Sequence, residues 1–408
     1  MTFSVREVSL GEVCEIKQGR YLAPNQMEPI PTNECIVPVI GGNGVLGYTD
    51  QSTFPFPVPL VTCRGSKCGL MQWAEPPTWI SNNAMAVYFK ENQGDNFFLH
   101  QYLLNSSFDD VTTGSAQPQI TVTNLSLKQI LLPDLLTQKK ISLIMKNIEA
   151  KIATNNALSK TLEDIAQTIF KSWFTDFDPV KAKLAGEKPV GMDSVTAALF
   201  PDSMVDSELG LIPKGWEVRS LDEISEYLNG LAMQKFPVTD EDEQLPVIKI
   251  AQLRAGNTQG ADVASGLLDA RFIIKDGDIL FSWSGTLEVE IWAGGPGALN
   301  QHLFKVSGET VPDWYSYLST KSFLSFLREI ASGKATTMGH IQRGHLSESK
   351  LAIPNLELLN RATEIIEPLI SLKIKTSIES RNLAEIRDSL LPRLISGEQQ
   401  IPEEMLAS

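Results

Sequence analysis

Two long stretches of the chain carry apolar residues at the spacing of one helix face. In the first, the steps within each run are three or four residues: Ile141, Ile144, Ile148 and Ile152, then Leu158, Leu162, Ile165, Ile169 and Trp173. This period is typical of a helix that packs along its whole length. No proline or glycine falls between residues 134 and 178. The pattern predicts a helix over 137–175, with a length of roughly 55–60 Å.

The second stretch, 356–397, has the same apolar stripe but contains Pro368 and Pro392. Because an internal proline removes a hydrogen bond and kinks a helix, we expect a break near Pro368, and Gly397 is expected to end the helix. Neither stripe is stable in water when exposed, so the two helices are expected to pair as an antiparallel coiled coil. The alternative is that each helix packs against its own globular domain.

The segments before these helices have a different pattern. Short apolar or alternating runs predict strands, at Val37–Ile40, Leu60–Cys63, Met85–Phe89, Val247–Ile250, Asp278–Ser282 and His302–Val306. Residues Phe97–Leu104 and Asp313–Ile330 look helical, and prolines and glycines are dense between the runs. We therefore predict two α+β domains, 1–136 and 214–355, each with a curved and mostly antiparallel sheet. Residues 176–213 form a linker and 398–408 a tail.

The chain repeats itself in two halves, which is best sought before other patterns. Ser9-Leu10-x-Glu12 matches Ser220-Leu221-x-Glu223, and Gly19 matches Gly230, at an offset of 211. From Ile120 and Ile341 onward the offset is 221 and stays constant through both long stretches. The matched positions are expected to form the packing stripe of the two helices: Ile144, Ile148, Leu162, Ile165, Ile169 and Trp173 with Ile365, Leu369, Leu383, Ile386, Leu390 and Leu394. The alternative is two unrelated amphipathic helices in accidental phase.

Composition narrows the class of protein. A hydrophobic content of 42% and a charged content of 21% are those of a folded globular protein. We expect no membrane span and no signal peptide, because no apolar run is long enough and the first ten residues alternate in the manner of a strand. The four cysteines lie in the first half of the repeat only, so free thiols in the cytoplasm are expected.

The net charge of −14 bears on nucleic-acid binding, because phosphate is neutralised by lysine and arginine. Counted by segment, residues 1–136, 137–213, 214–354 and 355–408 carry net charges of −5, −1, −5 and −3, so none of these four segments is basic. Any contact with DNA must therefore be local, or shared with a more basic partner.

Three motifs resemble catalytic or cofactor sites and are not expected to be such sites. Residues 42–47 fit a dinucleotide fingerprint, but the chain continues as a strand where the fingerprint needs a helix. Residues 339–344 resemble a phosphate loop, but His345 stands where the loop needs lysine. The acidic run 240–243 is expected to be a solvated loop. We find no metal-ligand cluster and no nucleophile elbow.

The pattern as a whole resembles the specificity subunit of type I DNA restriction–modification systems. The resemblance covers nearly the whole chain. It rests on the repeated Ser-Leu-x-Glu opening, on the junction Asp206–Trp216 and on Leu132-Pro133 and Ile353-Pro354. It also rests on the ends of the helices, Phe174–Val180 and Leu390–Glu398. The resemblance implies two target recognition domains, each reading one half of a bipartite site in double-stranded DNA, held apart by the paired helices.

It also implies that this chain is not an enzyme and carries no cofactor or metal. Two methyltransferase subunits that bind S-adenosylmethionine and methylate adenine would dock on the helices, and motor-nuclease subunits would join through them. Two rival hypotheses remain: a single-chain methyltransferase or nuclease, and a scaffold with two protein-binding heads.

Polar residues in the loops of each domain are predicted to read bases, since arginine suits guanine and glutamine suits adenine. In the first domain these are Asn43, Tyr48, Arg64, Ser66 and Lys67. In the second they are Ser282, Ser284, Thr286, Gln301, Lys334 and Arg343. The alternative for each is an ordinary surface or turn residue.

Overall fold

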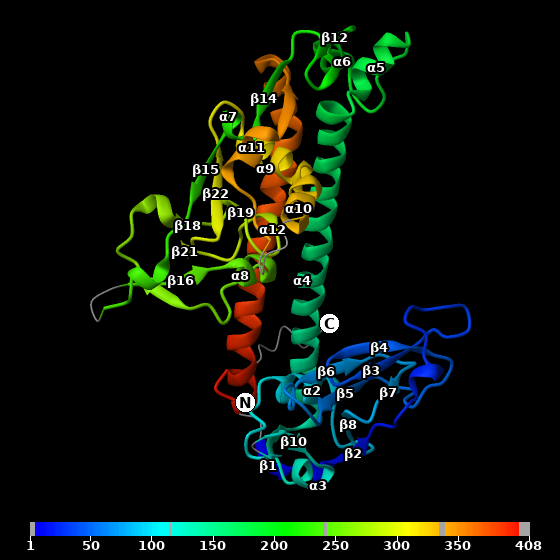
Figure 1. Ribbon diagram of the computed structural model, residues 1–408. Helices are drawn as coiled ribbons and strands as arrows, with labels where there is room; N and C mark the ends of the chain where they lie inside the picture. Colours follow the sequence, from blue (N-terminus) through cyan, green and yellow to red (C-terminus); the bar gives the residue numbers. More distant parts are fainter. Residues whose placement is uncertain (1–4, 115, 240–242, 334–338, 400–408) are drawn as a thin grey trace. The chain divides into compact units, whose positions relative to one another are not determined.

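The computed structural model describes residues 5–114, 116–239, 243–333 and 339–399. The chain divides into unit 1, made of residues 1–151 and 383–408, and unit 2, made of residues 152–382. The division falls inside both long helices, α4 (Leu135–Phe170) and α12 (Leu356–Ser396). Each unit therefore contains one globular part and a piece of each helix (Figure 1).

The sheets of the two units have the same strand order. In unit 1, β2 (Cys14–Gln18), β8 (Ala84–Phe89), β5 (Val58–Thr62) and β6 (Met71–Ala74) form an antiparallel sheet in that order. In unit 2, β15 (Ser225–Asn229), β22 (Leu303–Gly308), β19 (Ile279–Ser282) and β20 (Val289–Ile291) form its counterpart. The predicted α+β class and the internal repeat are confirmed.

A second sheet in each unit contains a parallel pair. Unit 1 has β4 (Gly44–Thr49), β3 (Val37–Gly41) and β7 (Trp79–Ile80), with β3 parallel to β7. Unit 2 has β17 (Val263–Ser265), β16 (Gln244–Ile248), β21 (Gly297–Leu299) and β18 (Ile273–Ile274), with β16 parallel to β21. Both sheets are otherwise antiparallel.

Each globular part closes with a two-stranded pair that leads into a long helix. In unit 1, β1 (Val5–Ser9) pairs with β11 (Gln129–Pro133), and in unit 2, β14 (Glu217–Ser220) pairs with β23 (Lys350–Ile353). The repeated Ser-Leu-x-Glu sequence begins the short helices α1 (Leu10–Val13) and α7 (Leu221–Ile224). The backbone N–H groups of Ser9 and Ser220 donate to the carboxylates of Glu12 and Glu223, which is a capping box in both units.

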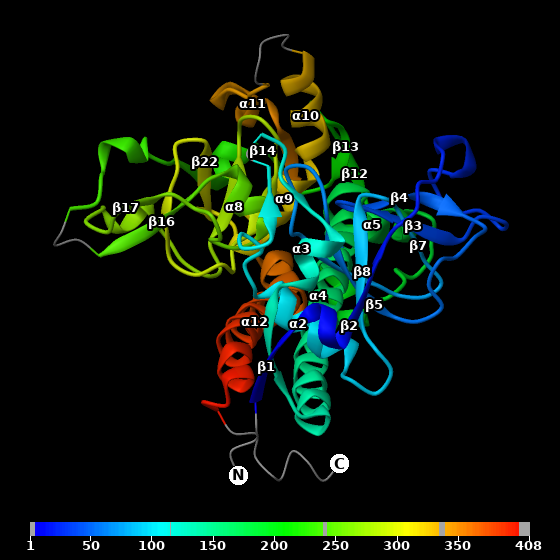
Figure 2. The same cartoon turned by 90° about the horizontal axis from the view of Figure 1, so that it is seen from below.

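Further helices cover the sheets. In unit 1, α2 (Asn96–Leu104) packs on β5 and β6, and α3 (Val122–Ser126) precedes β11. Both helices are labelled in Figure 2. In unit 2, the predicted helix 313–330 is two helices, α9 (Asp313–Ser322) and α10 (Leu324–Gly333), with α11 (Arg343–Glu348) in the place of α3. The smaller elements are α8 (Ile250–Ala255), β9 (Thr112–Thr113), β10 (Gln119–Ile120), η1 (Pro24–Gln26), η3 (Met233–Lys235) and η4 (Ala270–Phe272).

The two long helices run antiparallel within each unit, as predicted. In unit 2, Asn155 donates to Glu379 at 2.8 Å, and the hydroxyls of Ser159 and Ser377 lie 3.1 Å apart. In unit 1, Ile141 and Met145 share a core with Leu391, Leu394 and Ile395. This core also includes residues of α2 and of one face of the sheet. In unit 1 the long helices therefore pack both against each other and against the globular part, so the predicted pairing and its alternative both occur.

The predicted packing stripe is correct at most positions and wrong at two. Leu162, Trp173 and Leu394 are buried, and the partly buried members are Ile144, Ile148, Ile169, Ile365, Leu369, Leu383 and Leu390. Ile165 and Ile386, which match at the offset of 221, are 42% and 49% exposed. The prediction failed there because the stripe is wider than the helix–helix contact, and these two positions lie at its solvent side.

The expected break at Pro368 does not occur, because α12 continues from Leu356 to Ser396. A proline inside a helix costs roughly 3 kcal/mol. Ile366 and Ile370, on either side of it, are 0% and 4% exposed in the core of unit 2, and their burial offsets this cost. Gly397 ends the helix as predicted, with φ at +77°.

Residues 176–213 are more than a connecting segment. After a π-helical turn, η2 (Lys171–Thr175), they form α5 (Asp178–Leu184), α6 (Ser194–Leu199) and a hairpin of β12 (Met204–Ser207) and β13 (Gly210–Pro213). Val180, Phe200 and Ile212 are buried in the core of unit 2. Each element is too short for its apolar residues to show a period, so the sequence pattern indicated only a linker.

A buried histidine makes unit 1 sensitive to acid. Burial lowers the pKa of His100 in α2 to about 4. The unfolded chain binds this proton near pH 6.5, so the free energy of unfolding is expected to fall by up to about 3 kcal/mol as the pH drops from 6.5 to 4. Urea unfolding at several pH values should show this loss, and His100→Gln should reduce it. An unchanged pH dependence in the variant would contradict the assignment.

Candidate nucleic-acid interface

Equivalent loops in the two units carry five of the eleven predicted base-reading residues, namely Arg64, Ser66 and Lys67 in unit 1 and Ser284 and Thr286 in unit 2. In unit 1 the loop follows β5, and Arg64 pairs with Gln119 while the N–H of Gly65 donates to the carbonyl of Pro118. In unit 2 the loop follows β19, and Ser284 pairs with His340 while the N–H of Gly285 donates to Gly339. The predicted residues after β5 and those after β19 therefore lie on structurally equivalent loops.

An amide at the end of the first strand of each sheet forms a hydrogen bond with a neighbouring turn or loop. Gln18, the last residue of β2, donates from Nε2 to the carbonyl of Asn82 at 2.6 Å. Asn229, the last residue of β15, accepts from Trp283 Nε1 at 3.0 Å. Each amide is followed by a glycine of the repeat, Gly19 or Gly230. The end of β2 is thus joined to the turn at Asn82, and the end of β15 is joined to the loop at Trp283.

In unit 1 the predicted residues fall into two groups. Asn43, at the turn between β3 and β4, and Arg64, Ser66 and Lys67 in the loop after β5 are all exposed. Tyr48 is not brought to this turn, because it lies toward the far end of β4, where its backbone pairs with Glu28.

Gln72 connects the turn of Asn43 to the sheet. It donates to the carbonyl of Gly41 and accepts from the N–H of Gly44, both at 2.9 Å. Gly44 has φ at +93°, which favours glycine. The glycine-rich motif is therefore a hairpin turn, as interpreted from the sequence, with no helix to hold a pyrophosphate.

Arg64 and Lys67 are suited to contact an anion. Within the described part of the chain, neither forms an ion pair with a carboxylate, although acidic residues outnumber basic residues 49 to 35. Exposed cations without partners in an acidic protein are available to phosphate or to a guanine edge.

In unit 2 the equivalent surface has a different chemistry. Thr286 is exposed, and Gln301 is half-buried beside His302, with Gln301 Nε2 at 3.4 Å from His302 Nε2. Arg343 begins α11, donates to the carbonyl of Tyr227 at 3.1 Å and lies 5.7 Å from the centre of the Phe304 ring. Its side chain is exposed, and these contacts fix its direction. Lys334 lies outside the described residues.

Ser282 and Ser284 correct the sequence prediction. Ser282 is fully buried, donates to the carbonyl of Thr286 at 2.7 Å and accepts from the N–H of Glu288, so it closes the loop and is not available to a base. Ser284 is 5% exposed, and its hydroxyl lies 3.0 Å from His302 Nδ1. Both serine side chains are buried and form hydrogen bonds within the protein, so they hold the loop in shape.

Sequence reasoning missed Gln18, Asn82 and His302. The repeat contained a usable signal for Gln18, because an amide residue precedes the matched glycine in both halves. Asn82 and His302 lie in turns whose strands are far apart in sequence from Cys63 and Ser284, and only strand pairing brings them together.

The described residues 5–114, 116–239, 243–333 and 339–399 also bear on metal binding and on membrane spans. Those residues contain no group of three or more histidine, cysteine or acidic side chains that could hold a metal. In the same ranges no helix is long and apolar enough to cross a membrane.

Comparison with known proteins agrees with this architecture. The model of the type I restriction modification DNA specificity domain matches residues 4–164 and 213–387. The chain is 28% identical to the HindI specificity subunit of Haemophilus influenzae, over 69% of this chain and 71% of that protein. It is 27% identical to the MjaIX specificity subunit of Methanocaldococcus jannaschii, over 86% and 79%.

The fold also matches a solved structure. The type I restriction–modification S subunit from M. genitalium superimposes with a TM-score of 0.58 at 14% identity, over 96% of both chains. The family model covers both halves of the repeat, and each half contains one globular part with its loop surface. The chain therefore belongs to the type I restriction modification DNA specificity family, as the non-catalytic specificity subunit, which carries no cofactor itself.

Proposed function

We propose that each unit reads one half of a bipartite site in double-stranded DNA, and that the long helices dock two copies of one adenine methyltransferase subunit. That partner binds S-adenosylmethionine and, in the cytoplasm where its DNA substrate lies, methylates the site. Motor-nuclease subunits join through it. The observation that carries the proposal is the repeat, because two equivalent surfaces suit two copies of a single partner.

We infer the binding surface of this partner from exposed positions of the two long helices. Buried residues match between the two halves of the sequence because both halves have the same fold. A shared fold does not require exposed residues to match. Asp164, Ile165 and Thr168 of α4 match Glu385, Ile386 and Ser389 of α12 at the offset of 221, and all six are exposed. An acid, an isoleucine and a hydroxyl thus recur on each unit at the same helix positions. We call this set the matched surface.

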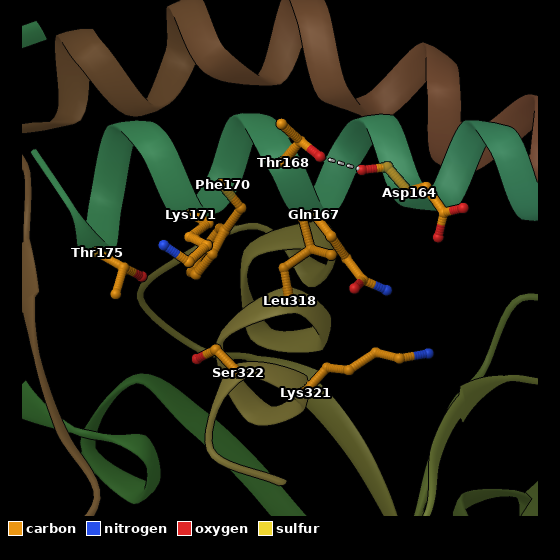
Figure 3. A pocket seen from close by; sticks show the side chains of 9 residues that line it. All are labelled: Asp164, Gln167, Thr168, Phe170, Lys171, Thr175, Leu318, Lys321 and Ser322. Carbon is orange, nitrogen blue, oxygen red and sulfur yellow. Dashed lines mark hydrogen bonds between the residues drawn. The ribbon is translucent and has the colours of Figure 1, made fainter. Parts of the chain in front are cut away.

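On unit 2 the matched surface borders a pocket of about 480 Å³ between α4 and α9 (Figure 3). Asp164 and Thr168 line it together with Lys171 from α4 and Leu318 and Lys321 from α9. The pocket joins charges of both signs to an apolar floor, which suits the side chains of a protein partner.

The docking surface is tested by counting bound partners. Ile165→Asp and Ile386→Asp are each expected to remove one of two bound methyltransferase subunits, and the double variant is expected to remove both. A buried charge without a partner accounts for the loss. Native mass spectrometry of the reconstituted complex measures the stoichiometry.

Leu158→Asp is the matched control, because Leu158 is 39% exposed on α4 but corresponds to Glu379 on α12. Two bound methyltransferase subunits in the Ile165→Asp/Ile386→Asp variant would contradict the proposed surface.

Half-site reading is tested by one substitution in each unit. Arg64→Ala is expected to relax base preference in one half of the site only, and Gln301→Ala in the other half only, by about 1–3 kcal/mol per base pair read. Competition binding of the methyltransferase complex to a library of sites gives both preferences. One continuous footprint, or the same preference change from both variants, would argue against the proposal. A complex that ignored DNA would support the scaffold hypothesis.

A further inference from the structure

A cleft of about 790 Å³ lies beside the loop surface of unit 1. Its walls come from the end of β2, with Lys17, Gln18 and Arg20, and from the loop 51–56 between β4 and β5. Tyr88 of β8 closes it. No sequence pattern indicated this cleft, because its walls come from segments far apart in the chain.

The cleft has an aromatic wall. Phe54, Phe56 and Tyr88 meet edge to face, with ring centres 5.2–5.9 Å apart. Phe54 and Tyr88 are each 8% exposed, but Phe56 is 37% exposed. The two buried rings fix the position of the third, so a flat apolar surface faces the cleft without further ordering.

Two cations lie at the same cleft. Lys17 is 5.2 Å from the centre of the Tyr88 ring and pairs with Glu15 at 3.0 Å, and Tyr88 donates to the same carboxylate. Arg20 is exposed and, among the residues that the structure describes, forms no ion pair. The backbone at Arg20 is fixed, because its carbonyl accepts from Trp79 Nε1 at 3.2 Å and its N–H donates to Ile80. The backbone of Arg20 is therefore held in place at the cleft, and its guanidinium forms no ion pair with any carboxylate in the described residues.

Gln18 joins the cleft to the loop surface. It lines the cleft, and its amide also donates to the carbonyl of Asn82 and lies 3.3 Å from Cys63 Sγ, next to Arg64. A strand contacted by Arg64 would therefore continue toward Arg20 along the protein surface.

We propose that this cleft binds the sugar–phosphate backbone of the DNA strand that flanks the half-site of unit 1. Arg20, with Lys17 beside it, takes a phosphate, and the ring of Phe56 packs against a deoxyribose. This inference rests on the proposed function and extends it. The contact adds affinity and fixes register without reading sequence. It also adds local positive charge to that of Arg64 and Lys67 in a chain that is acidic as a whole.

The experiment measures DNA affinity of the methyltransferase-bound complex against salt concentration. Arg20→Ala is expected to weaken binding about tenfold at low salt and to reduce the slope of log affinity against log salt by about 0.9, the value for one phosphate contact. Base preference should not change. On a duplex trimmed at the flank next to the half-site of unit 1, Arg20→Ala should have no effect.

Two further variants make the test specific. Phe56→Ala should lower affinity for the long duplex but leave the salt slope unchanged, because it removes no charge. Arg6→Ala is the charge-matched control, since Arg6 is exposed on β1 in the same unit and does not line the cleft. Its salt slope should equal that of the unchanged chain.

Three results would overturn the inference: an unchanged salt slope in Arg20→Ala, an altered base preference, or equal loss on trimmed and long duplexes. A free nucleotide shares the same chemistry. Saturable binding of ATP to the complex that Arg20→Ala abolishes, with DNA binding unaltered, would assign the cleft to that ligand instead. A duplex without any target still reports the salt slope, so failure of the half-site proposal is distinguishable from failure of this one.

Discussion

Replacing Glu163 by alanine is expected to lower the free energy of unfolding of unit 2 by about 3–5 kcal/mol, because it removes the carboxylate that the buried Lys373 faces and leaves Lys321 with Glu290 alone. Glu163 on α4 pairs with Lys321 of α9 and lies 3.5 Å from Lys373 of α12. Lys321 also pairs with Glu290 of β20 at 3.0 Å. Two acids and two bases are thus balanced where both long helices meet the globular part.

The pH dependence of this contribution has a definite sign. Burial raises the pKa of Glu163, but the charges of Lys373 and Lys321 outweigh burial, so the pKa is lower than its ordinary value of 4.5. The stabilisation is therefore complete above pH 4.5 and is lost as the pH falls through the lowered pKa.

Urea unfolding followed by tryptophan fluorescence suits this measurement. Trp73 and Trp79 belong to unit 1, and the remaining five of the seven tryptophans belong to unit 2. Asp164→Ala, at the exposed neighbouring position, is the control and should change stability by less than about 0.5 kcal/mol. In a double-mutant cycle, Glu163→Gln with Lys373→Met should cost less than the sum of the two single changes. Simple additivity would contradict the coupling.

Gly230→Ala is expected to abolish recognition of the half-site of unit 2 while the other half-site is still read. A methyl group at this position would lie 2.2 Å from the carbonyl oxygen of Asn300 and 2.5 Å from that of Leu299. Both atoms are backbone, so the strand end must move, and the hydrogen bonds from Gly230 to Leu303 and from Leu231 to Leu299 are strained. Overpacking of this kind costs about 1–3 kcal/mol or more. It also displaces Gln301, the next residue along the turn.

The equivalent change in unit 1, Gly19→Ala, should give the mirror result, because its methyl group would lie 2.1 Å from the carbonyl oxygen of Ser81. Gly344→Ala is the control, since nothing lies within 4 Å of its added methyl group and the position is inside α11. Binding to sites altered in one half at a time measures the outcome. Full half-site preference in Gly230→Ala would show that the turn does not position the loop surface.

The sequence by itself determined the architecture. The period of apolar residues located both long helices, and the constant offset of 221 established that the two halves share one fold. The repeated sequence Ser-Leu-x-Glu marked the start of each half, and a capping box forms at both copies. These features are local or regularly spaced, so a linear pattern is enough to find them.

Only the tertiary structure decided which residues form surfaces. Ile165 and Ile386 fit the helix period as well as their buried neighbours do, and the width of the helix contact alone leaves them exposed. Ser282 has a hydroxyl that could contact a base, but this side chain is buried and donates to the carbonyl of Thr286 in its own loop. The β2 cleft, the Glu163 network and the pairing of Gln18 with Asn82 join segments distant in the chain. No local sequence pattern reveals such contacts, because strand pairing and burial bring these residues together and residue type alone does not.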